Sequence, residues 1–383
     1  MNAIVLRRRA RPLRRLLQAP ATLRHIRSQQ TVQEALREVR DRLRRELSAP
    51  SGLDAASSAA KALVADALQP RLASSSDVFF HGERQLAEQE AARLRESVEQ
   101  RAKGEPLAYV LGRKEFWSLE FEVTRDTLIP RSDSEVLIET LVVGGRPPHG
   151  AELLRLTQRF SLCWLTWQDQ FHPQTPLRIL DVGTGSGCLL LSALSEFPRA
   201  TGVGIDISPG ALAVAKQNAR IHDFDGRAEF LLRDLQALPQ LRADVVEDEE
   251  LYQRFDVILC NPPYIPCQEL HLVGPDVLEY EPHLALFSDG GPTAPNSGAD
   301  PEGLRMYRLV YESVARLFKD STKPRHSSTR NCLLMEIGSQ AQAQAVQKLF
   351  FNVTQAPTGS HLEFERFLFD ANGKYRGLLF LSP

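Results

Sequence analysis

Residues 177–194 read LRILDVGTGSGCLLLSAL, and this stretch decides the fold. The apolar run that ends at Val182 predicts a buried strand, and the apolar run that begins at Cys188 predicts a helix. Between them lies a glycine-rich turn, residues 183–187, which lets the chain turn tightly and a ligand approach the backbone closely. A strand, a turn and a helix in this order indicate an α/β fold with a mainly parallel sheet.

The spacing of the glycines distinguishes two classes of ligand. The pattern from Asp181 to Gly187 is Asp-x-Gly-x-Gly-x-Gly, which differs from the Gly-x-Gly-x-x-Gly of dinucleotide sites. A carboxylate at Asp181 would repel a pyrophosphate, but it suits the ammonium group of S-adenosylmethionine. An acidic residue at this position alone would more often be a helix cap or a solvated charge.

Two further acidic residues follow predicted strands in order. The strand at 201–206 ends in Asp206, about 20 residues after the glycines, where an acid can hold ribose hydroxyls. The strand at 228–232 leads to Asp234, which could meet the adenine amino group. Three acids at successive strand ends favour S-adenosylmethionine as the cofactor. The predicted cofactor-binding residues are Asp181, Gly183, Thr184, Gly185, Gly187, Asp206, Ile207, Asp234, Leu235 and Asn261.

The second motif, Asn261-Pro262-Pro263-Tyr264, follows the apolar run 255–260. Ligands of open α/β sheets bind where strands end. The Asn261 side-chain oxygen and the Pro262 carbonyl could accept both N–H bonds of a planar NH2 group, and the prolines would hold these acceptors in place beforehand. Tyr264 offers a flat apolar face to the same group. A proline-rich turn is the alternative, but it does not explain the flanking residues. We therefore predict these four residues as catalytic, in methylation of an amide or amino nitrogen.

With both motifs present, the chain resembles the release factor glutamine methyltransferases, which methylate the glutamine of the Gly-Gly-Gln motif in class I peptide chain release factors. The resemblance runs from about Leu86 to the C-terminus and includes residues 104–112, Glu336-Ile337-Gly338 and 370–376. Residues 128–135 are similar to the family's Ile-Pro-Arg-Pro-Glu-Thr-Glu stretch, with serine and aspartate in place of the second proline and the first glutamate. The resemblance implies these substrate-binding residues: Pro130, Arg131, Asn261, Pro262 and Tyr264.

The resemblance also implies a class I methyltransferase fold, a Rossmann-like, doubly wound sheet after a small helical domain. Predicted strands alternate with helical patterns, and Asn372-Gly373 predicts an antiparallel hairpin at the end of the chain. Phe79, Phe80, Leu86 and Leu94 are expected in the core of the helical domain, with its charges on solvated helix faces. The predicted strands lie at 177–182, 201–206, 228–232, 255–260, 332–337, 362–369 and 375–381. The expected segments are a helical substrate-docking domain (31–113), a hairpin linker (114–127), the methyltransferase domain (128–383) and surface insertions at 144–176, 243–253 and 292–299.

The first thirty residues differ from the rest. Residues 1–30 contain eight arginines, and no acidic residue occurs before Glu34. This composition predicts a mitochondrial transit peptide and a location in the matrix. The alternative is a basic arm that binds RNA or the ribosome.

The composition bounds the other functions. The 383 residues are 43% hydrophobic and 25% charged, enough for two domains. A net charge of −2 gives no whole-molecule attraction to nucleic acid and favours a protein substrate. The five cysteines show no metal-ligand spacing, so we predict no metal site. We also expect no membrane span, because no apolar stretch is long enough, and a monomer.

Three functions remain. The favoured one is a glutamine N5-methyltransferase that acts on a mitochondrial class I peptide chain release factor, without direct nucleic acid binding. An adenine N6-methyltransferase is the second, since Asn-Pro-Pro-Tyr also serves exocyclic amino groups; the lack of a separate target-recognition domain and of basic excess disfavours it. A non-catalytic assembly factor is the third, which the intact acids and the intact 261–264 motif disfavour.

Overall fold

The computed structural model describes residues 26–46, 52–144, 167, 171–295, 297–319, 330–351 and 362–382. By its contacts the chain divides into two compact units, Met1–Gly104 and Glu105–Pro383. Residues 1–25 of the predicted transit peptide and most of the insertion predicted at 144–176, residues 145–166 and 168–170, lie outside the described residues.

The last residues of the predicted transit peptide belong to the first unit. Ile26 is 2% exposed, and its carbonyl accepts a hydrogen bond from Arg95 at 2.7 Å. The Gln29 N–H donates to the Leu86 carbonyl at 3.1 Å. Removal of residues 26–30 would therefore take away part of the folded unit, so a presequence compatible with this packing ends before Ile26.

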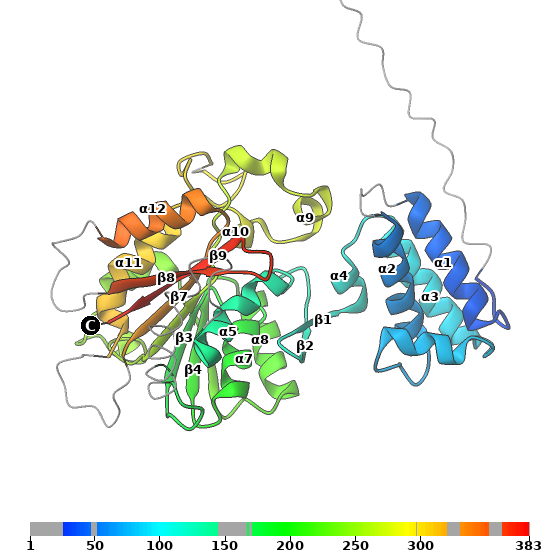
Figure 1. Ribbon diagram of the computed structural model, residues 1–383, viewed down its shortest axis with the longest axis horizontal. Coiled ribbons are helices and arrows are strands. Elements are labelled where there is room, and N and C mark those ends of the chain that lie inside the picture. The colour runs from blue at the N-terminus through cyan, green and yellow to red at the C-terminus, as the bar shows by residue number, and fades with distance from the viewer. Residues whose placement is uncertain are drawn as a thin grey trace, which may run out of the picture. The chain divides into compact units, whose positions relative to one another are not determined.

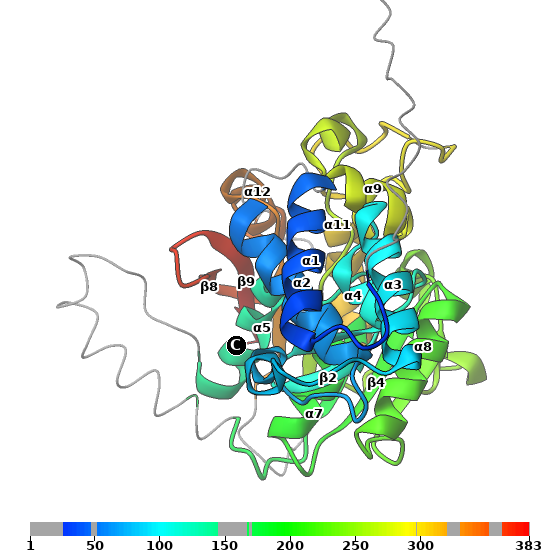
Figure 2. The same ribbon diagram turned by 90° about the vertical axis from the view of Figure 1, so that its right-hand side faces the viewer.

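The first unit is helical, with α1, α2 and α3 next to one another (Figure 2). Its core holds Leu43, Leu86 and Leu94, of which the last two were predicted there. The prediction for Phe79 and Phe80 was wrong, because the short helix η1 turns Val78 inward and leaves these rings 65% and 87% exposed. The elements of this unit are α1 (Val32–Glu46), α2 (Gly52–Ala67), η1 (Ser75–His81) and α3 (Glu88–Ala102).

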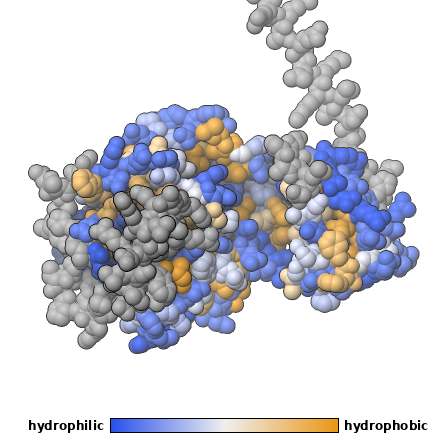
Figure 3. Space-filling view, viewed as in Figure 1, coloured by the Kyte–Doolittle hydropathy of each residue, from blue (hydrophilic) through white to orange (hydrophobic). Residues whose placement is uncertain are grey.

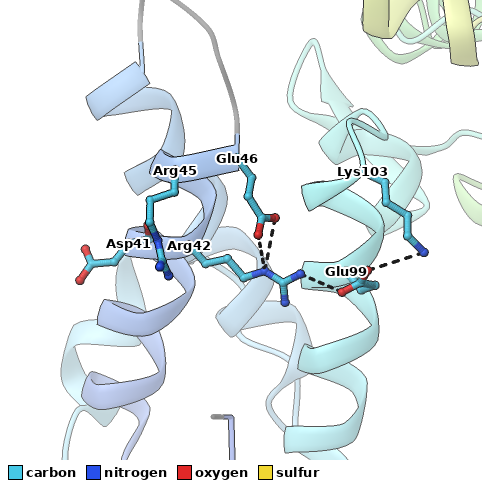
Figure 4. Close-up of polar contacts among 6 residues, drawn as sticks. All are labelled: Asp41, Arg42, Arg45, Glu46, Glu99 and Lys103. Atoms are coloured by element: carbon cyan, nitrogen blue, oxygen red, sulfur yellow. Dashed lines mark hydrogen bonds and ion pairs between the residues drawn. The ribbon is translucent and has the colours of Figure 1, made fainter. Parts of the chain in front are cut away.

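Two charged residues of this helical unit, Arg42 and Glu90, are buried, contrary to the expectation of solvated charges. The Arg42 side chain is 11% exposed and lies between α1 and α3 (Figure 4). It donates to Glu99 at 2.8 Å and to Glu46 at 3.2 Å, and Lys103 contacts Glu99 at 3.7 Å. The two carboxylates compensate the guanidinium, and loss of either would leave buried charge without its partner.

The second unit begins with α4 (Leu107–Leu111) and a two-stranded antiparallel hairpin of β1 (Arg113–Phe116) and β2 (Leu119–Glu122). Trp117 and Ser118 form its turn with φ of +50° and +61°. The Trp117 N–H donates to Glu135 at 3.0 Å, at the start of α5 (Glu135–Val143). The hairpin predicted at 114–127 is thus present and is tied to the following helix.

A seven-stranded sheet forms the centre of this unit, in the order β5-β4-β3-β6-β7-β9-β8. β3 to β7 are parallel, and β9 pairs antiparallel with both β7 and β8. The predicted strands and the terminal hairpin are confirmed. Their bounds are β3 (Arg178–Val182), β4 (Thr201–Asp206), β5 (Ala228–Leu232), β6 (Val257–Cys260), β7 (Cys332–Glu336), β8 (Glu363–Phe369) and β9 (Tyr375–Leu381).

Helices cover both faces of the sheet (Figure 1). α5, α7 (Cys188–Glu196) and α8 (Pro209–Ile221) lie on one face, and α11 (Arg305–Leu317) and α12 (Gln340–Phe351) lie on the other. Because successive strand residues point to opposite faces, Leu259 belongs to one apolar core and Ile258 to the other. The coloured surface in Figure 3 is mostly hydrophilic, with separate hydrophobic patches. This is the doubly wound class I methyltransferase fold that was expected.

Shorter helices surround the carboxyl ends of the strands. They are η2 (Ser132–Ser134), η3 (Leu235–Gln240), η4 (Val246–Asp248), η5 (Cys267–Leu272), α9 (Pro275–Tyr280) and α10 (His283–Leu286). Among the described helices none is long and apolar enough to cross a membrane.

The strand order brings the two motifs together. β3 lies between β4 and β6, with Val182 opposite Ile205 on one side and Cys260 on the other. The residues that follow these strand ends therefore meet at one edge of the sheet. After β3 the next strands are added on one side, and from β6 they are added on the other; open α/β sheets bind ligands at such a switch in strand order. Cys260 in turn pairs with Met335 of β7, which places Glu336 beside the Asn261 motif.

Candidate functional site

A cavity of about 670 Å³ lies at this edge of the sheet, within the second unit. Such a volume is typical of small-molecule and cofactor sites. Most of the predicted site residues line it: Pro130, Arg131, Gly183, Thr184, Gly185, Asp206, Ile207, Asp234, Leu235, Asn261, Pro262 and Pro263. Asp181, Gly187 and Tyr264 are not among the lining residues.

The glycine-rich turn presents bare backbone to the cavity. Gly183 and Gly185 have φ of +73° and +55°, which glycine adopts readily. A Cβ added at Gly185 would meet no atom within 4 Å, so that side of the turn is open. The N–H groups of Gly183 and Thr184 both donate to the Ile205 carbonyl at 2.9 Å. The turn is therefore fixed against β4 while its open side is available to a ligand.

Gly187 has a packing role. A Cβ there would lie 3.3 Å from Leu191 and 3.4 Å from Ala215, so its small size lets α7 and α8 approach each other. Gly187 does not line the cavity, and its predicted contact with the cofactor stays a prediction.

Asp181 also lies beneath the cavity. It is 1% exposed, and the Thr184 hydroxyl donates to its carboxyl at 2.7 Å. Burial raises the pKa of Asp181 to about 7, and the Thr184 hydrogen bond partly opposes this. Asp181 does not line the cavity, and its predicted direct contact with the ammonium group of S-adenosylmethionine stays a prediction.

Asp206 ends β4 and lines the cavity. Its two carboxyl oxygens accept the N–H groups of Gly185 and Ser208, each at 2.9 Å. Burial raises the pKa of Asp206, and these backbone hydrogen bonds oppose the shift. A carboxylate has about four lone-pair sites, so further donors such as ribose hydroxyls can still bind. Asp206 thus couples the glycine-rich turn to the bound ligand.

Asp234 and Leu235 follow β5 at the far side of the cavity. The Asp234 carboxyl caps η3 by accepting the Gln236 N–H at 2.9 Å. Gln236 in turn accepts a hydrogen bond from Arg305 at 2.9 Å, and both of these side chains line the cavity. The second carboxyl oxygen of Asp234 accepts from the Gln236 side chain at 3.4 Å, and a carboxylate has lone pairs left for a further donor such as an adenine amino group.

Asn261 leaves β6 directly into the cavity. β6 is fully buried, and the Asn261 side-chain N–H donates to the Ser134 hydroxyl oxygen at 3.3 Å. The amide oxygen of Asn261 is then the free end of the side chain. Pro262 and Pro263 line the cavity beside it.

Tyr264 turns away from the cavity. Its hydroxyl donates to the Glu336 carboxyl at 3.3 Å, and its ring lies where a Cβ on Gly338 would come within 2.8 Å. Tyr264 thus anchors the loop, and its predicted role as a flat face for the substrate stays a prediction. Burial raises the pKa of Glu336 to about 7, while the Ser134 and Tyr264 hydroxyls oppose this shift.

Arg131 lines the opposite wall and is held by a buried acid. Its guanidinium contacts Glu281 at 2.6 Å, and that carboxylate also accepts the Ile129 N–H at 3.1 Å. The Glu281 side chain is 1% exposed, so the pair fixes Pro130 and Arg131 beside the cavity. The insertion predicted at 292–299 contributes Thr293 and Ala294 to the same cavity.

Comparisons with known proteins agree with this site. Residues 34–112 match the PrmC N-terminal domain, and residues 174–302 match a methyltransferase domain. A release factor glutamine methyltransferase of Geobacter sulfurreducens is 33% identical over 278 residues, which cover 71% of this chain and 74% of that protein. One of Cereibacter sphaeroides is 33% identical over 302 residues, 79% of this chain and 84% of that protein. The chain belongs to the release factor glutamine methyltransferase family.

Among solved structures, Aeropyrum pernix fibrillarin with bound S-adenosyl-L-methionine is similar at a TM-score of 0.32 and 13% identity, over 55% of this chain and 68% of that one. The present chain, as a member of the release factor glutamine methyltransferase family, uses S-adenosylmethionine as its cofactor. The residues fit it: an open glycine turn, the Asp206 carboxylate and apolar Ile207 and Leu235 share one cavity. Within the described residues, no group of three or more His, Cys, Asp or Glu side chains could hold a metal ion.

Sequence reasoning missed three polar residues behind the Asn-Pro-Pro-Tyr loop of this methyltransferase. Ser134 bonds Asn261, Glu336 bonds Tyr264, and Gln342 bonds the Tyr264 carbonyl. Ser134 and Glu336 occur in stretches that were noticed for their resemblance, but no local pattern gave them a role. Gln342 lies in a helical stretch whose sequence carries no signal for it.

Proposed function

We propose that this protein transfers a methyl group from S-adenosylmethionine to the side-chain N5 of the glutamine in the Gly-Gly-Gln motif of a mitochondrial class I peptide chain release factor. It would thereby support translation termination in the mitochondrial matrix. The observation that carries this proposal is the placement of Asn261, which lines the same cavity as the open glycine turn and whose side-chain N–H donates to Ser134, so that its amide oxygen is left to accept.

The Ser134 contact determines which end of Asn261 can meet the substrate. Because the Ser134 hydroxyl donates to the Glu336 carboxyl, its oxygen accepts from the Asn261 N–H at 3.3 Å, and the amide oxygen of Asn261 remains to accept a hydrogen bond. The carbonyl of Pro262 is a second acceptor on the same rigid loop. Two acceptors on one loop suit an NH2 group, which carries two donors, and disfavour a hydroxyl, which carries one.

An amide nitrogen needs orientation more than deprotonation. The cofactor supplies a methyl group on a positively charged sulfur. As the nitrogen lone pair forms the N–C bond, the S–C bond breaks with its electrons passing to sulfur, and the amide then loses a proton to water. Hydrogen bonds to both N–H groups favour the tetrahedral nitrogen of the transition state over the planar amide. Asn261 and Pro262 therefore act by alignment without a general base.

The mitochondrial address rests on the arginine-rich, acid-free start of the chain. The packing of Ile26 limits the removable segment to residues before it. The arginines of this segment would respond to import receptors and the membrane potential.

One assay tests the proposed reaction. The purified protein is incubated with methyl-labelled S-adenosylmethionine and a mitochondrial release factor, the same factor with its Gly-Gly-Gln glutamine changed to alanine, or DNA. We expect label only in the unchanged release factor. Label in DNA would support an adenine methyltransferase, and no label in any sample, despite cofactor binding, would support an assembly factor.

A further inference from the structure

The backbone carbonyl of Tyr264, at the end of the Asn-Pro-Pro-Tyr loop, accepts a hydrogen bond from one buried side chain. Gln342, near the start of α12, is 8% exposed. Its side-chain N–H groups donate to the carbonyls of Tyr264 and Gly303, both at 3.1 Å. Its side-chain oxygen accepts the Gly338 N–H at 2.9 Å. One amide thus joins three segments that lie far apart in the sequence.

The backbone groups determine the orientation of this amide. The carbonyls of Tyr264 and Gly303 can only accept, so they must face the NH2 end. The Gly338 N–H can only donate, so it must face the oxygen. A flipped amide would lose all three hydrogen bonds, and a carboxylate could keep only the bond from Gly338.

The same loop is confined from two other sides. A Cβ on Gly303 would come within 2.2 Å of the Tyr264 carbonyl oxygen, and one on Gly338 would come within 2.8 Å of the Tyr264 ring. The loop is therefore blocked on the sides of Gly303 and Gly338, so that a shift on loss of the Gln342 amide would have to carry it away from these glycines. Gln342 is not among the residues that line the cavity, so it does not meet the cofactor or the substrate directly.

We propose that Gln342 is a positioning residue of the methyl-transfer step, which holds the Tyr264 carbonyl so that the acceptors on Asn261 and Pro262 keep their places in the cavity. This inference rests on the proposed function of that loop. The Tyr264 carbonyl is close along the chain to the Pro262 carbonyl, and Tyr264 is anchored a second time through Glu336. A shift at this anchor is passed to the acceptors by stiff prolines.

The effect should appear in turnover more than in cofactor affinity. Misplacement of a reacting group by about 1 Å can cost on the order of 10²-fold in rate. We expect Gln342→Ala to lower kcat roughly 10- to 100-fold, with the Kd for S-adenosylmethionine changed by less than about twofold. Gln344→Ala is the matched control, since Gln344 is an exposed glutamine on the same helix.

The isosteric change Gln342→Glu tests the positioning role through the pH dependence of kcat, which a purely structural role would leave unchanged. In its protonated form the introduced carboxyl keeps one donor for the two carbonyls, and in its ionised form it keeps none. The kcat of this variant relative to wild type should therefore fall as the pH rises, whereas the same ratio for Gln344→Glu should stay flat.

Three results would overturn the proposal. The first is a kcat for Gln342→Ala within about twofold of wild type. The second is a loss of cofactor affinity in Gln342→Ala as large as its loss of kcat. The third is a kcat of Gln342→Glu, relative to wild type, that does not change with pH. If neither Gln342 variant folds, the residue acts in stability alone and the proposal also falls.

Hydrogen exchange separates this inference from the proposed function. If the wild-type protein does not methylate the release factor, the proposed function fails. Whether Gln342 holds the loop can still be measured. The Ile265 N–H, which donates to the Leu286 carbonyl at 3.0 Å, should exchange faster in Gln342→Ala than in Gln344→Ala. Equal exchange in the two variants would show that Gln342 does not hold the loop.

Discussion

The side-chain amide of Asn261 donates to the Ser134 hydroxyl oxygen at 3.3 Å, although 127 positions separate the two residues in the sequence. This contact brings the short helix before α5 against the end of β6. It leaves the amide oxygen of Asn261, a residue that lines the cavity, to accept a hydrogen bond. Ser134 also lies close enough to Glu336 to lower the pKa of that buried carboxyl, against the larger effect of burial.

Asn261→Ala removes the acceptor that aligns the substrate amide. We expect the rate of methyl transfer to fall by on the order of 10²-fold or more, with cofactor binding near normal, because the lost hydrogen bond strengthens in the transition state. Single-turnover kinetics with the release factor measure this loss. Asn372→Ala, in the exposed turn of the terminal hairpin, is the control, and retained turnover in Asn261→Ala would contradict the role.

Ser134→Ala leaves Asn261 in place but removes its partner. The Asn261 amide can then rotate, so we expect kcat to fall by about tenfold, less than for Asn261→Ala. Ser132→Ala is the matched control, because Ser132 is an exposed serine in the same short helix. Equal kcat values for the two serine variants would show that the contact does not orient Asn261.

Asp206→Ala removes a carboxylate that lines the cavity and holds the glycine-rich turn. We expect S-adenosylmethionine to bind more weakly by roughly 1–3 kcal/mol, the loss typical of charge-assisted hydrogen bonds. Isothermal titration calorimetry measures the change, with the exposed Asp225→Ala as control. An unchanged affinity for Asp206→Ala would remove Asp206 from the cofactor site.

The buried Glu336 makes the stability of the cofactor-free protein depend on pH. Burial raises its pKa from the ordinary 4.5 to about 7. Between these values the folded protein holds a proton that the unfolded chain releases, so the stabilisation is complete below the ordinary pKa and is lost as the pH rises through about 7. Between about pH 5 and pH 8 we expect the unfolding free energy of wild type to decrease more than that of Glu336→Gln. The difference between the two decreases should be roughly 3 kcal/mol.

Urea unfolding of both proteins at the two pH values measures this difference. Glu365→Gln, which changes an exposed glutamate on β8, should follow wild type. Parallel pH curves for wild type and Glu336→Gln would mean that Glu336 does not titrate in this range.

A chain that lacks residues 1–25 should be fully active in vitro and should fail to enter mitochondria. The remaining chain begins at Ile26, which packs on the first unit, so folding should be unaffected. Import into isolated mitochondria and the methylation assay measure the two effects. Loss of activity with normal import would favour the basic arm and would remove the mitochondrial address.

The sequence predicted the strands well, because each is a short apolar run that stands next to a turn signal. It also predicted Gly183, Gly185, Asp206 and Asn261 in the cavity, since residues that follow parallel strands meet at one edge of a sheet. It could not predict the direction of a side chain at a strand end. The sequence placed Asp181 with these residues, but it gave no sign that the side chain is buried and bonded to Thr184.

The polar support of the Asn-Pro-Pro-Tyr loop was out of reach for a different reason. Ser134 and Gln342 reach the loop across 127 and 78 positions, and these contacts depend on how helices pack on the finished sheet. A single sequence has no pattern for such contacts. Phe79 and Phe80 failed in the same way, because their apolar character does not reveal which face of a short helix is buried.

The central claim is that the Asn261 loop presents a glutamine amide to the methyl donor. Tandem mass spectrometry of the mitochondrial release factor, after incubation with the protein and S-adenosylmethionine, tests it most directly. The account predicts a single added methyl group, located by fragment ions on the side chain of the Gly-Gly-Gln glutamine and absent with Asn261→Ala. A methyl group on any other residue, or an unmodified release factor in the presence of bound cofactor, would contradict it.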